Sequence, residues 1–207
     1  MLPPYQSLLI PDEPDFLLSQ DSDSSILTLI SQDRMNRLTN NKVSELINQI
    51  TSFANTQSRP KPLIIRGEVN FSAGADLSQI ARLTGPEAYE FAALGQSLMN
   101  RIANFPAPVI AAIDGHCMGG GLDLALACHR RIAAPTAVLG HRGAALGLIT
   151  GWGGTQRLPR LIGKGRALEL LVAAEKLTAH RALEIGLIDA IASDPLAEAL
   201  RQLRAIA

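Results

Sequence analysis

Apolar residues are spaced along the chain in two different ways. Between Val43 and Phe53 they recur every three or four positions, which predicts an amphipathic helix over 41–54. In 62–66 and 108–113 they form short continuous runs, which are typical of buried strands. Both kinds of element therefore occur in this chain.

The remaining elements are predicted from their boundaries. Apolar residues at 16–18 and 26–30 flank the polar turn 19–25 and predict a hairpin. Thr84 followed by Glu87 three residues later is typical of a capping box, so a helix starts there and ends near Pro106. Further helices are predicted after the glycines at 119–121 as far as about Cys128, and at 154–162, 165–174, 178–185 and 195–206, with a last strand at 187–191.

The order of these elements favours an α/β fold, because strand, helix, strand, glycine loop and helix follow one another repeatedly. The 207 residues suit one domain, and no linker or low-complexity tract interrupts them. We therefore expect a single domain over 1–207, with an N-terminal extension or hairpin in 1–24 and a helical C-terminal part in 163–207.

Composition and charge exclude several classes of protein. Hydrophobic residues make up 47% of the chain, and 19 basic residues balance 19 acidic ones. A formal charge of zero gives no reason to expect a nucleic-acid or anionic-membrane partner. No apolar run approaches the roughly 18 residues that a membrane helix needs, and the N-terminus lacks the pattern of a secretory signal.

The cysteines and histidines carry no obvious chemistry of their own. Cys117 and Cys128 lie in a segment of small residues, which predicts reduced, buried thiols and a cytoplasmic protein. The four histidines do not have metal-ligand spacing, so no metal is expected.

Two glycine-rich loops are the strongest candidates for a functional site. Residues 71–77 follow the first compact apolar strand, and residues 115–123 follow the second. Each places small residues where a strand ends and a helix begins, where backbone N–H groups lack partners within the helix. Two such helix starts facing one carbonyl oxygen would form an oxyanion hole. Alternatively, Gly119–Gly121 serve only close packing of helix against strand.

Four motifs in order resemble the crotonase superfamily, which includes the enoyl-CoA hydratases and isomerases. They are Phe-Ser-Ala-Gly-Ala-Asp-Leu at 71–77, Ala-Ala-Ile-Asp-Gly at 111–115, three glycines at 119–121, and Gly-Gly-Thr-Gln-Arg-Leu-Pro-Arg at 153–160. The resemblance covers about residues 25–206. It implies a spiral of ββα turns, a coenzyme A thioester as substrate with no further cofactor, and a homo-oligomer, either a trimer or a hexamer.

The resemblance also assigns residues to the thioester site. The two N–H groups that hold the thioester oxygen belong, by motif position, to Ala75 and Gly120. Ala73, Gly74 and Gly119 are the neighbouring substrate-binding positions. Trp152, the only tryptophan, either lines the acyl pocket or is a packing residue.

The acid/base residues depart from the family pattern. A hydratase of the family uses two glutamates; Asp123 stands at the first position and Gly143 at the second. Gly151 stands where some isomerases carry an aspartate. Asp123 is therefore the candidate acid or base, although an aspartate in the first turn of a helix is also explained by the helix dipole. His141, two residues before the vacated position, is a second candidate proton donor.

Outside these motifs the resemblance is thinner. Arg34 and Arg37 flank Asn36, which resembles the family's early Asn-x-Leu turn, and they are candidates for the CoA phosphates or else solvated charges. Family members continue with further helices that help to build the trimer and the acyl and CoA sites. Relative to that pattern, the C-terminal helical region of this chain is short.

Three functions remain open at this point. The first is an acyl-CoA enzyme that stabilises a thioester enolate and performs isomerisation, decarboxylation, hydrolysis or weak hydration. The second is an inactive acyl-CoA-binding or scaffolding homologue, and the third is a partner subunit whose glycine loops serve only packing.

Overall fold

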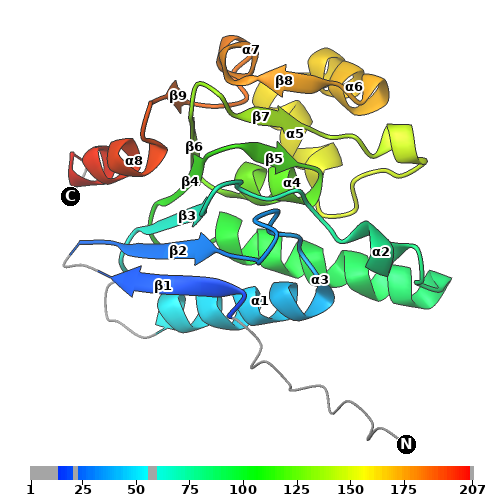
Figure 1. Cartoon of the computed structure of the whole chain (residues 1–207), viewed down its shortest axis with the longest axis horizontal. Coiled ribbons are helices and arrows are strands. Elements are labelled where there is room, and N and C mark those ends of the chain that lie inside the picture. The colour runs from blue at the N-terminus through cyan, green and yellow to red at the C-terminus, as the bar shows by residue number, and fades with distance from the viewer. Residues whose placement is uncertain (1–13, 21–22, 56–59, 206–207) are drawn as a thin grey trace, which may run out of the picture.

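The computed structural model describes residues 14–20, 23–55 and 60–205. Residues 1–13 of the predicted extension, 21–22 of the predicted turn and Ile206 of the last predicted helix lie outside them. The larger sheet (Figure 1) has six strands in the order β1-β2-β3-β4-β6-β9. These strands are β1 (Phe16–Gln20), β2 (Ser25–Leu29), β3 (Leu63–Gly67), β4 (Val109–Ile113), β6 (Arg130–Ala133) and β9 (Ala190–Ile191).

The predicted hairpin is present, because β1 and β2 pair antiparallel. All other neighbours in the larger sheet are parallel. A smaller sheet contains β5 (His116–Met118), β7 (Val138–Gly140) and β8 (Lys176–Thr178). There β5 and β7 are parallel, whereas β7 and β8 are antiparallel.

Nine helical segments connect and cover the strands in the described part of the chain. They are α1 (Asn40–Asn55), α2 (Leu77–Ile80), α3 (Gly85–Ala103), α4 (Gly120–Ala127), the short 3₁₀ turn η1 (Ala144–Leu146), α5 (Gly154–Ile162), α6 (Lys164–Ala173), α7 (Ala179–Glu184) and α8 (Pro195–Arg204). None of them is long and apolar enough to cross a membrane.

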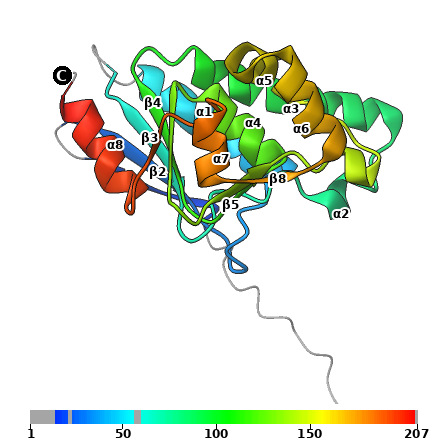
Figure 2. The same cartoon turned by 90° about the horizontal axis from the view of Figure 1, so that it is seen from above.

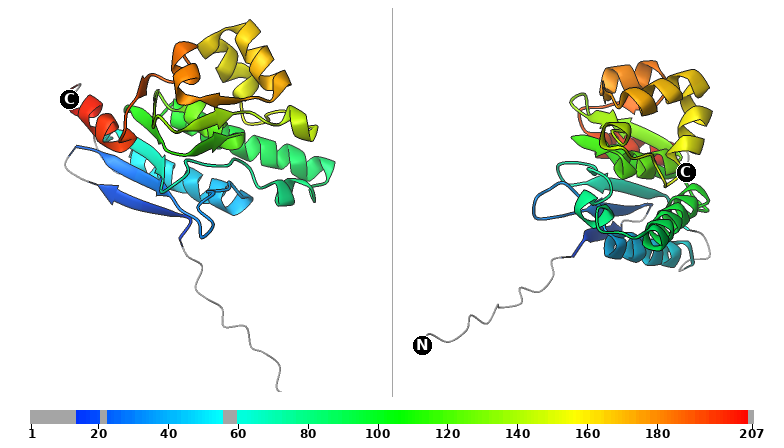
Figure 3. Two further views of the ribbon diagram at one scale, coloured as in Figure 1. Left: turned by 45° about the horizontal axis from the view of Figure 1, so that its top comes forward. Right: turned by 90° about the vertical axis from the view of Figure 1, so that its right-hand side faces the viewer.

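The chain repeats a ββα unit along its length. In one unit β4 and β5 lead into α4, and in the next β6 and β7 lead into α5. Because β4 pairs with β6 and β5 pairs with β7, successive units stack side by side through both sheets. This arrangement is the ββα spiral that the sequence resemblance implied, and the α/β fold class is confirmed (Figures 1 and 3).

The central strands are apolar throughout because both of their faces are buried. Ile64 and Ile110 point to one face, where they pack with Ala199 and Leu203 of α8. Their neighbours such as Ile65 belong to the main core on the other face, which α1, α3 and α4 cover. Figure 2 shows α8 alone on its side of the larger sheet. Strands of this kind give the compact apolar runs seen in the sequence.

The predicted helices are all present, and their boundaries lie within a few residues of the predicted ones. Thr84 and Glu87 form the expected capping box at the start of α3. The strands β5 to β8 were not predicted, since each has only three or four residues and no strict alternation of apolar and polar positions. The last strand is shorter than predicted, because only Ala190–Ile191 pairs with β6.

Candidate active site

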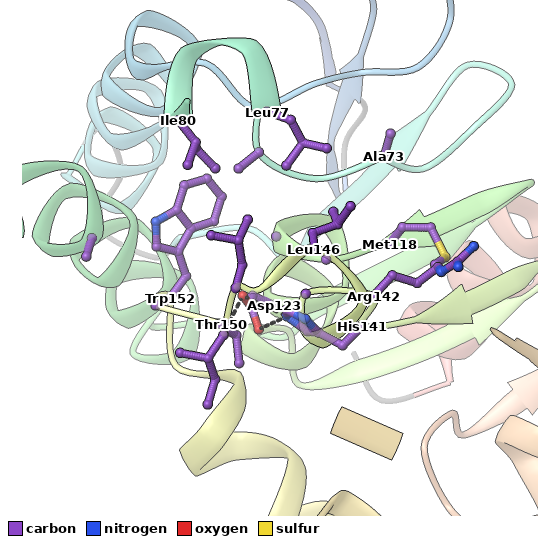
Figure 4. A pocket seen from close by; sticks show the side chains of 18 of the residues that line it. Ala73, Leu77, Ile80, Met118, Asp123, His141, Arg142, Leu146, Thr150 and Trp152 are labelled. Carbon is purple, nitrogen blue, oxygen red and sulfur yellow. Dashed lines mark hydrogen bonds and ion pairs between the residues drawn. The ribbon is translucent and has the colours of Figure 1, made fainter. Parts of the chain in front are cut away.

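One cavity lies where the two glycine-rich loops meet the segment between β7 and α5 (Figure 4). Its volume is about 490 Å³, and its lining residues are mostly apolar. Asp123 is the only carboxylate among the described residues that line it. The sequence-predicted residues on its wall are Ala73, Ala75, Gly119, Gly120, Asp123, His141 and Trp152.

The first loop is held in place by the turn that contains Asn36. This side chain is fully buried, and its amide donates to the backbone oxygen of Asn70 at 2.6 Å. The hydroxyl of Ser72 donates to the backbone oxygen of Asn36 at 2.7 Å and accepts the N–H of Gly74 at 3.0 Å. The loop is therefore fixed by buried hydrogen bonds before any ligand arrives.

A short β-bridge sets the direction of the Ala75 amide. The N–H of Leu38 donates to the oxygen of Gly74 at 2.9 Å, and the N–H of Asp76 donates to the oxygen of Leu38 at 3.3 Å. Successive N–H groups of an extended chain point to opposite sides. The C=O of Gly74 and the N–H of Asp76 both point toward Leu38. The N–H of Ala75, which lies between them, therefore points away from Leu38.

The second loop ends at the start of α4. Gly119 has a φ of 53°, a value that favours glycine, and its N–H donates to the oxygen of Gly140 at 2.9 Å. Gly120 is the first residue of the helix, so its N–H has no acceptor within the helix. Within the described part of the chain, neither this N–H nor that of Ala75 makes a hydrogen bond.

The two loops touch through their backbones. A Cβ added to Gly120 would lie 3.2 Å from the nitrogen of Ala75, and one added to Gly74 would lie 2.8 Å from the nitrogen of Gly120. Glycine at both positions is therefore what allows the two unpaired N–H groups to lie next to each other at the cavity.

Trp152 is both a packing residue and a wall of the cavity. Its ring is buried, meets Phe91 edge to face at 5.1 Å, and donates from Nε1 to the oxygen of Phe91 at 3.2 Å. A Cβ on Gly95 would lie 2.1 Å from Nε1, and one on Gly120 would lie 2.5 Å from Cζ3. The ring thus fills a slot between α3 and α4 beside the Gly120 amide.

Asp123 lies in the first turn of α4 and is only 2% exposed. The hydroxyl of Thr150 donates to its Oδ2 at 2.6 Å. Nε2 of His141 is 3.4 Å from each carboxylate oxygen. Oδ1 has no hydrogen-bond partner among the described residues, which is costly for a buried carboxylate unless a ligand supplies one.

The Asp123 carboxylate is not used for capping or for an ion pair with the nearest arginines in sequence. The N-cap of its helix has no side-chain hydrogen bond, and Arg131 pairs with Asp189 at 3.0 Å. Burial lowers the pKa of Arg157, while the negative charge of Asp123 acts in the opposite direction. Arg157 is thus a cation within electrostatic reach of the carboxylate, and no ion pair joins the two in the described structure.

The vacated glutamate position is closed by the loop itself. A Cβ on Gly143 would lie 2.8 Å from the backbone oxygen of Leu148. The N–H groups of Leu146 and Leu148 both donate to the oxygen of Gly143, at 2.8 and 2.9 Å. This tight turn leaves no room for a longer side chain without a shift of the backbone.

The other predicted residues lie away from this cluster. Arg34 and Arg37 are exposed on either side of Met35, which lines the cavity, and Arg37 pairs with Asp33. Asp76 caps α2, where its side chain accepts from the N–H groups of Ser78 and Gln79.

The two cysteines are free and buried, as predicted. Burial raises the pKa of Cys117 well above its usual value and that of Cys128 to about 12, so neither is a thiolate nucleophile. Within the described residues, no group of three or more histidine, cysteine or acidic side chains could hold a metal.

Sequence reasoning missed Thr150. A single threonine in a loop carries no motif, and only its place just before the glycines at 151–154 linked it to the candidate site. Its role depends on the fold, which brings the loop before α5 against the first turn of α4.

Comparisons with known proteins show which family the chain belongs to. The family described as "Enoyl-CoA hydratase/isomerase" matches residues 22–207. The chain belongs to the enoyl-CoA hydratase/isomerase family. This membership confirms the crotonase superfamily predicted from the sequence motifs.

Individual relatives of the family are similar over most of this chain. A "Probable enoyl-CoA hydratase" of Bacillus subtilis (strain 168) is 44% identical over 168 residues, which are 80% of this chain and 65% of that protein. The enoyl-CoA hydratase of Bacillus anthracis superposes with a TM-score of 0.88 at 33% identity, covering 93% of this chain and 76% of the other. The enoyl-CoA hydratase of Thermoplasma volcanium GSS1 gives 0.87 at 32% identity, covering 93% and 77%.

Proposed function

We propose that this chain processes an acyl-CoA thioester and stabilises its enolate in an oxyanion hole. The observation that carries the proposal is that two unpaired N–H groups, from Ala75 and Gly120, and one buried carboxylate, from Asp123, lie on the same cavity. The unused N–H groups also argue against loops that serve only packing, because packed backbone normally pairs its donors.

In the proposed mechanism the thioester oxygen accepts one hydrogen bond from the N–H of Ala75 and one from the N–H of Gly120. When a base removes a proton from the carbon next to the thioester, the electron pair moves onto that oxygen, where the preorganised donors stabilise it. Asp123 accepts the proton and returns it to the same carbon or to a conjugated one. The step is balanced without a cofactor, and its simplest outcome is isomerisation of a double bond.

Hydration of a double bond is the reaction that this site supports least. Adding water requires a group that activates the water as well as one that protonates carbon, and Gly143 has no side chain to do either. His141 is a neighbouring group able to move a proton, but it already faces Asp123. We therefore expect hydration to be slow, and isomerisation, decarboxylation or hydrolysis to be the main reaction.

The remaining parts of the proposal concern CoA, assembly and location. We infer that Arg34 and Arg37, which flank the cavity residue Met35, meet the CoA phosphates. We further infer a homo-oligomer, a trimer or a hexamer, in the cytoplasm.

A second candidate function is that of an inactive acyl-CoA-binding homologue. The closed turn at Gly143 favours it, because one of the family's two acid/base positions is removed by the backbone rather than by a simple side-chain change. It keeps the oxyanion hole as a binding site and assigns Asp123 no chemistry.

The two functions are separated by binding and turnover measured on the same variant. The parent and Asp123→Asn are titrated with a nonhydrolysable acyl-CoA analogue and assayed with a panel of acyl-CoA thioesters. We expect similar affinities, but a loss of turnover by a factor of about 10²–10⁴ in the variant. Binding without turnover in the parent supports the inactive homologue, and no binding at all contradicts both functions.

A further inference from the structure

Thr150 contacts Asp123 by a short hydrogen bond. Its hydroxyl lies 2.6 Å from Oδ2, and both side chains are buried, with Thr150 8% and Asp123 2% exposed. The two residues come from different elements, since Asp123 belongs to α4 and Thr150 to the loop before α5. A buried hydrogen bond to a carboxylate is short and strong compared with one between neutral groups.

The same hydroxyl takes part in a second hydrogen bond. The N–H of Gly154, the first residue of α5, donates to Oγ1 of Thr150 at 3.3 Å. Because a carboxylate oxygen only accepts, the hydroxyl gives its single proton to Asp123 and accepts from Gly154 with a lone pair. The N-terminus of α5 is thereby connected to the carboxylate through the hydroxyl, in the sense that favours negative charge.

Thr150 also determines which carboxylate oxygen is occupied. It takes Oδ2 and leaves Oδ1 without a hydrogen bond in the described structure. A Cβ on Gly154 would lie 2.3 Å from Oδ1 and 2.9 Å from the Thr150 hydroxyl, so glycine leaves the room that this placement needs. The dashed contacts of Figure 4 show Thr150 and His141 both reaching Asp123.

We propose that Thr150 is a positioning residue that fixes the side-chain torsion of Asp123, so that this single carboxylate is aimed at the carbon next to the thioester. This inference rests on the proposed function. An aspartate is one methylene shorter than a glutamate and reaches less far, so its angle must be set accurately. The hydroxyl of Thr150 holds Oδ2 of the carboxylate by a hydrogen bond, and Gly154 leaves room beside Oδ1.

The test compares three substitutions in the whole chain. Thr150→Val keeps the shape of the side chain and removes the hydroxyl, whereas Thr150→Ser keeps the hydroxyl. Thr155→Val is the matched control, because in the described residues Thr155 makes no hydrogen bond with Asp123. Turnover of the best acyl-CoA of the panel and thermal unfolding are measured for each protein.

We expect kcat of Thr150→Val to fall by a factor of about 10–10², the size typical of a misplaced catalytic group, with KM nearly unchanged. Thr150→Ser should recover most of the loss, and Thr155→Val should match the parent. Equal kcat in Thr150→Val and the parent overturns the proposal. The proposal is also overturned if Thr150→Ser has the thermal midpoint of the parent but does not recover the lost kcat. If Thr150→Val does not fold, Thr150→Ala takes its place. The proposal then predicts a lower kcat for Thr150→Ala than for Thr150→Ser, and equal kcat values overturn it.

Failure of this inference and failure of the proposed function give different experimental results. A parent that turns over no acyl-CoA contradicts the function itself. A parent that is active and whose kcat does not depend on the hydroxyl at position 150 contradicts only the role of Thr150.

Discussion

The two halves of the cavity are built from different chemical groups. The half proposed to bind the thioester offers the backbone N–H groups of Ala75 and Gly120, and its requirement on the sequence is small residues at fixed places. The half proposed for acid/base chemistry contains the side chains of Asp123, His141 and Thr150, which three separate segments bring together. The first half follows the family pattern and the second departs from it.

This difference shows which parts of an active site tolerate change. The backbone donors are held by the fold itself, through the bridge at Leu38 and the start of α4, so no single side chain supplies them. A side-chain acid or base is replaced by one substitution. The proposed thioester half therefore keeps the pattern that the motifs resemble, whereas Gly143 stands where that pattern has a glutamate.

A large effect should come from closing the proposed thioester half. A Cβ at Gly120 meets the Trp152 ring at 2.5 Å and the Ala75 nitrogen at 3.2 Å, so Gly120→Ala should disturb both donors. We expect turnover to fall by a factor of about 10²–10³, as when an oxyanion-hole donor is lost. The control is Gly85→Ala, since a Cβ there has nothing within 4 Å. Equal activity of the two variants, both folded, would show that Gly120 does not contribute to the hole.

The variant Gly143→Glu tests whether the proposed acid/base half can be restored. The parent should hydrate crotonyl-CoA more slowly than a two-carboxylate hydratase, by a factor of about 10²–10⁴. Gly143→Glu should not raise that rate, because its Cβ would lie 2.8 Å from the oxygen of Leu148. It should also lower the thermal midpoint by a few degrees, as a clash of about 1–3 kcal/mol would.

The control for this prediction is Gly165→Glu in α6, where a Cβ has nothing within 4 Å. A large gain of hydration in Gly143→Glu would mean that the turn rebuilds easily. The loss of the second carboxylate would then be a side-chain change only.

The smallest effect concerns a residue outside both halves. His129 accepts the N–H of Val109 through Nδ1 at 2.9 Å, and burial lowers its pKa from the usual value of 6.5. The unfolded chain therefore binds the proton first, and stability should be lost as the pH falls below about 6.5. The thermal midpoint of the parent should drop more between pH 7.5 and 5.5 than that of His129→Asn, whose amide oxygen can accept the same N–H. An equal drop would refute this role.

The meeting of the two glycine-rich loops was easier to predict from the sequence than the side-chain cluster around Asp123, for a physical reason. A backbone donor requires a strand end, a small-residue loop and a helix start in order, and this order is visible around Gly74 and Gly120. A side-chain cluster depends on which loops meet in space. Thr150 lies 27 residues from Asp123, and no periodicity or motif connects them.

The fold, like the candidate site, was predictable from the sequence only in part. Helices with a clear apolar face, such as α1, and buried strands, such as β3 and β4, were found with nearly correct boundaries. The three-residue strands β5 and β7 were not, because their pairing is set by the stacking of the ββα units rather than by their own residues.

The central claim is that Asp123 moves a proton at the carbon next to a thioester held by Ala75 and Gly120. The most direct measurement is the fate of deuterium placed at that carbon of a 3-enoyl-CoA when the labelled thioester is incubated with the parent or with Asp123→Asn. We predict that the parent removes the label from that carbon rapidly, by transfer to the conjugated carbon or by loss to solvent, and that the variant does so more slowly by a factor of about 10²–10⁴, at equal ligand affinity. Removal of the label at the same rate by both proteins, or none by a parent that binds the thioester, would contradict the account.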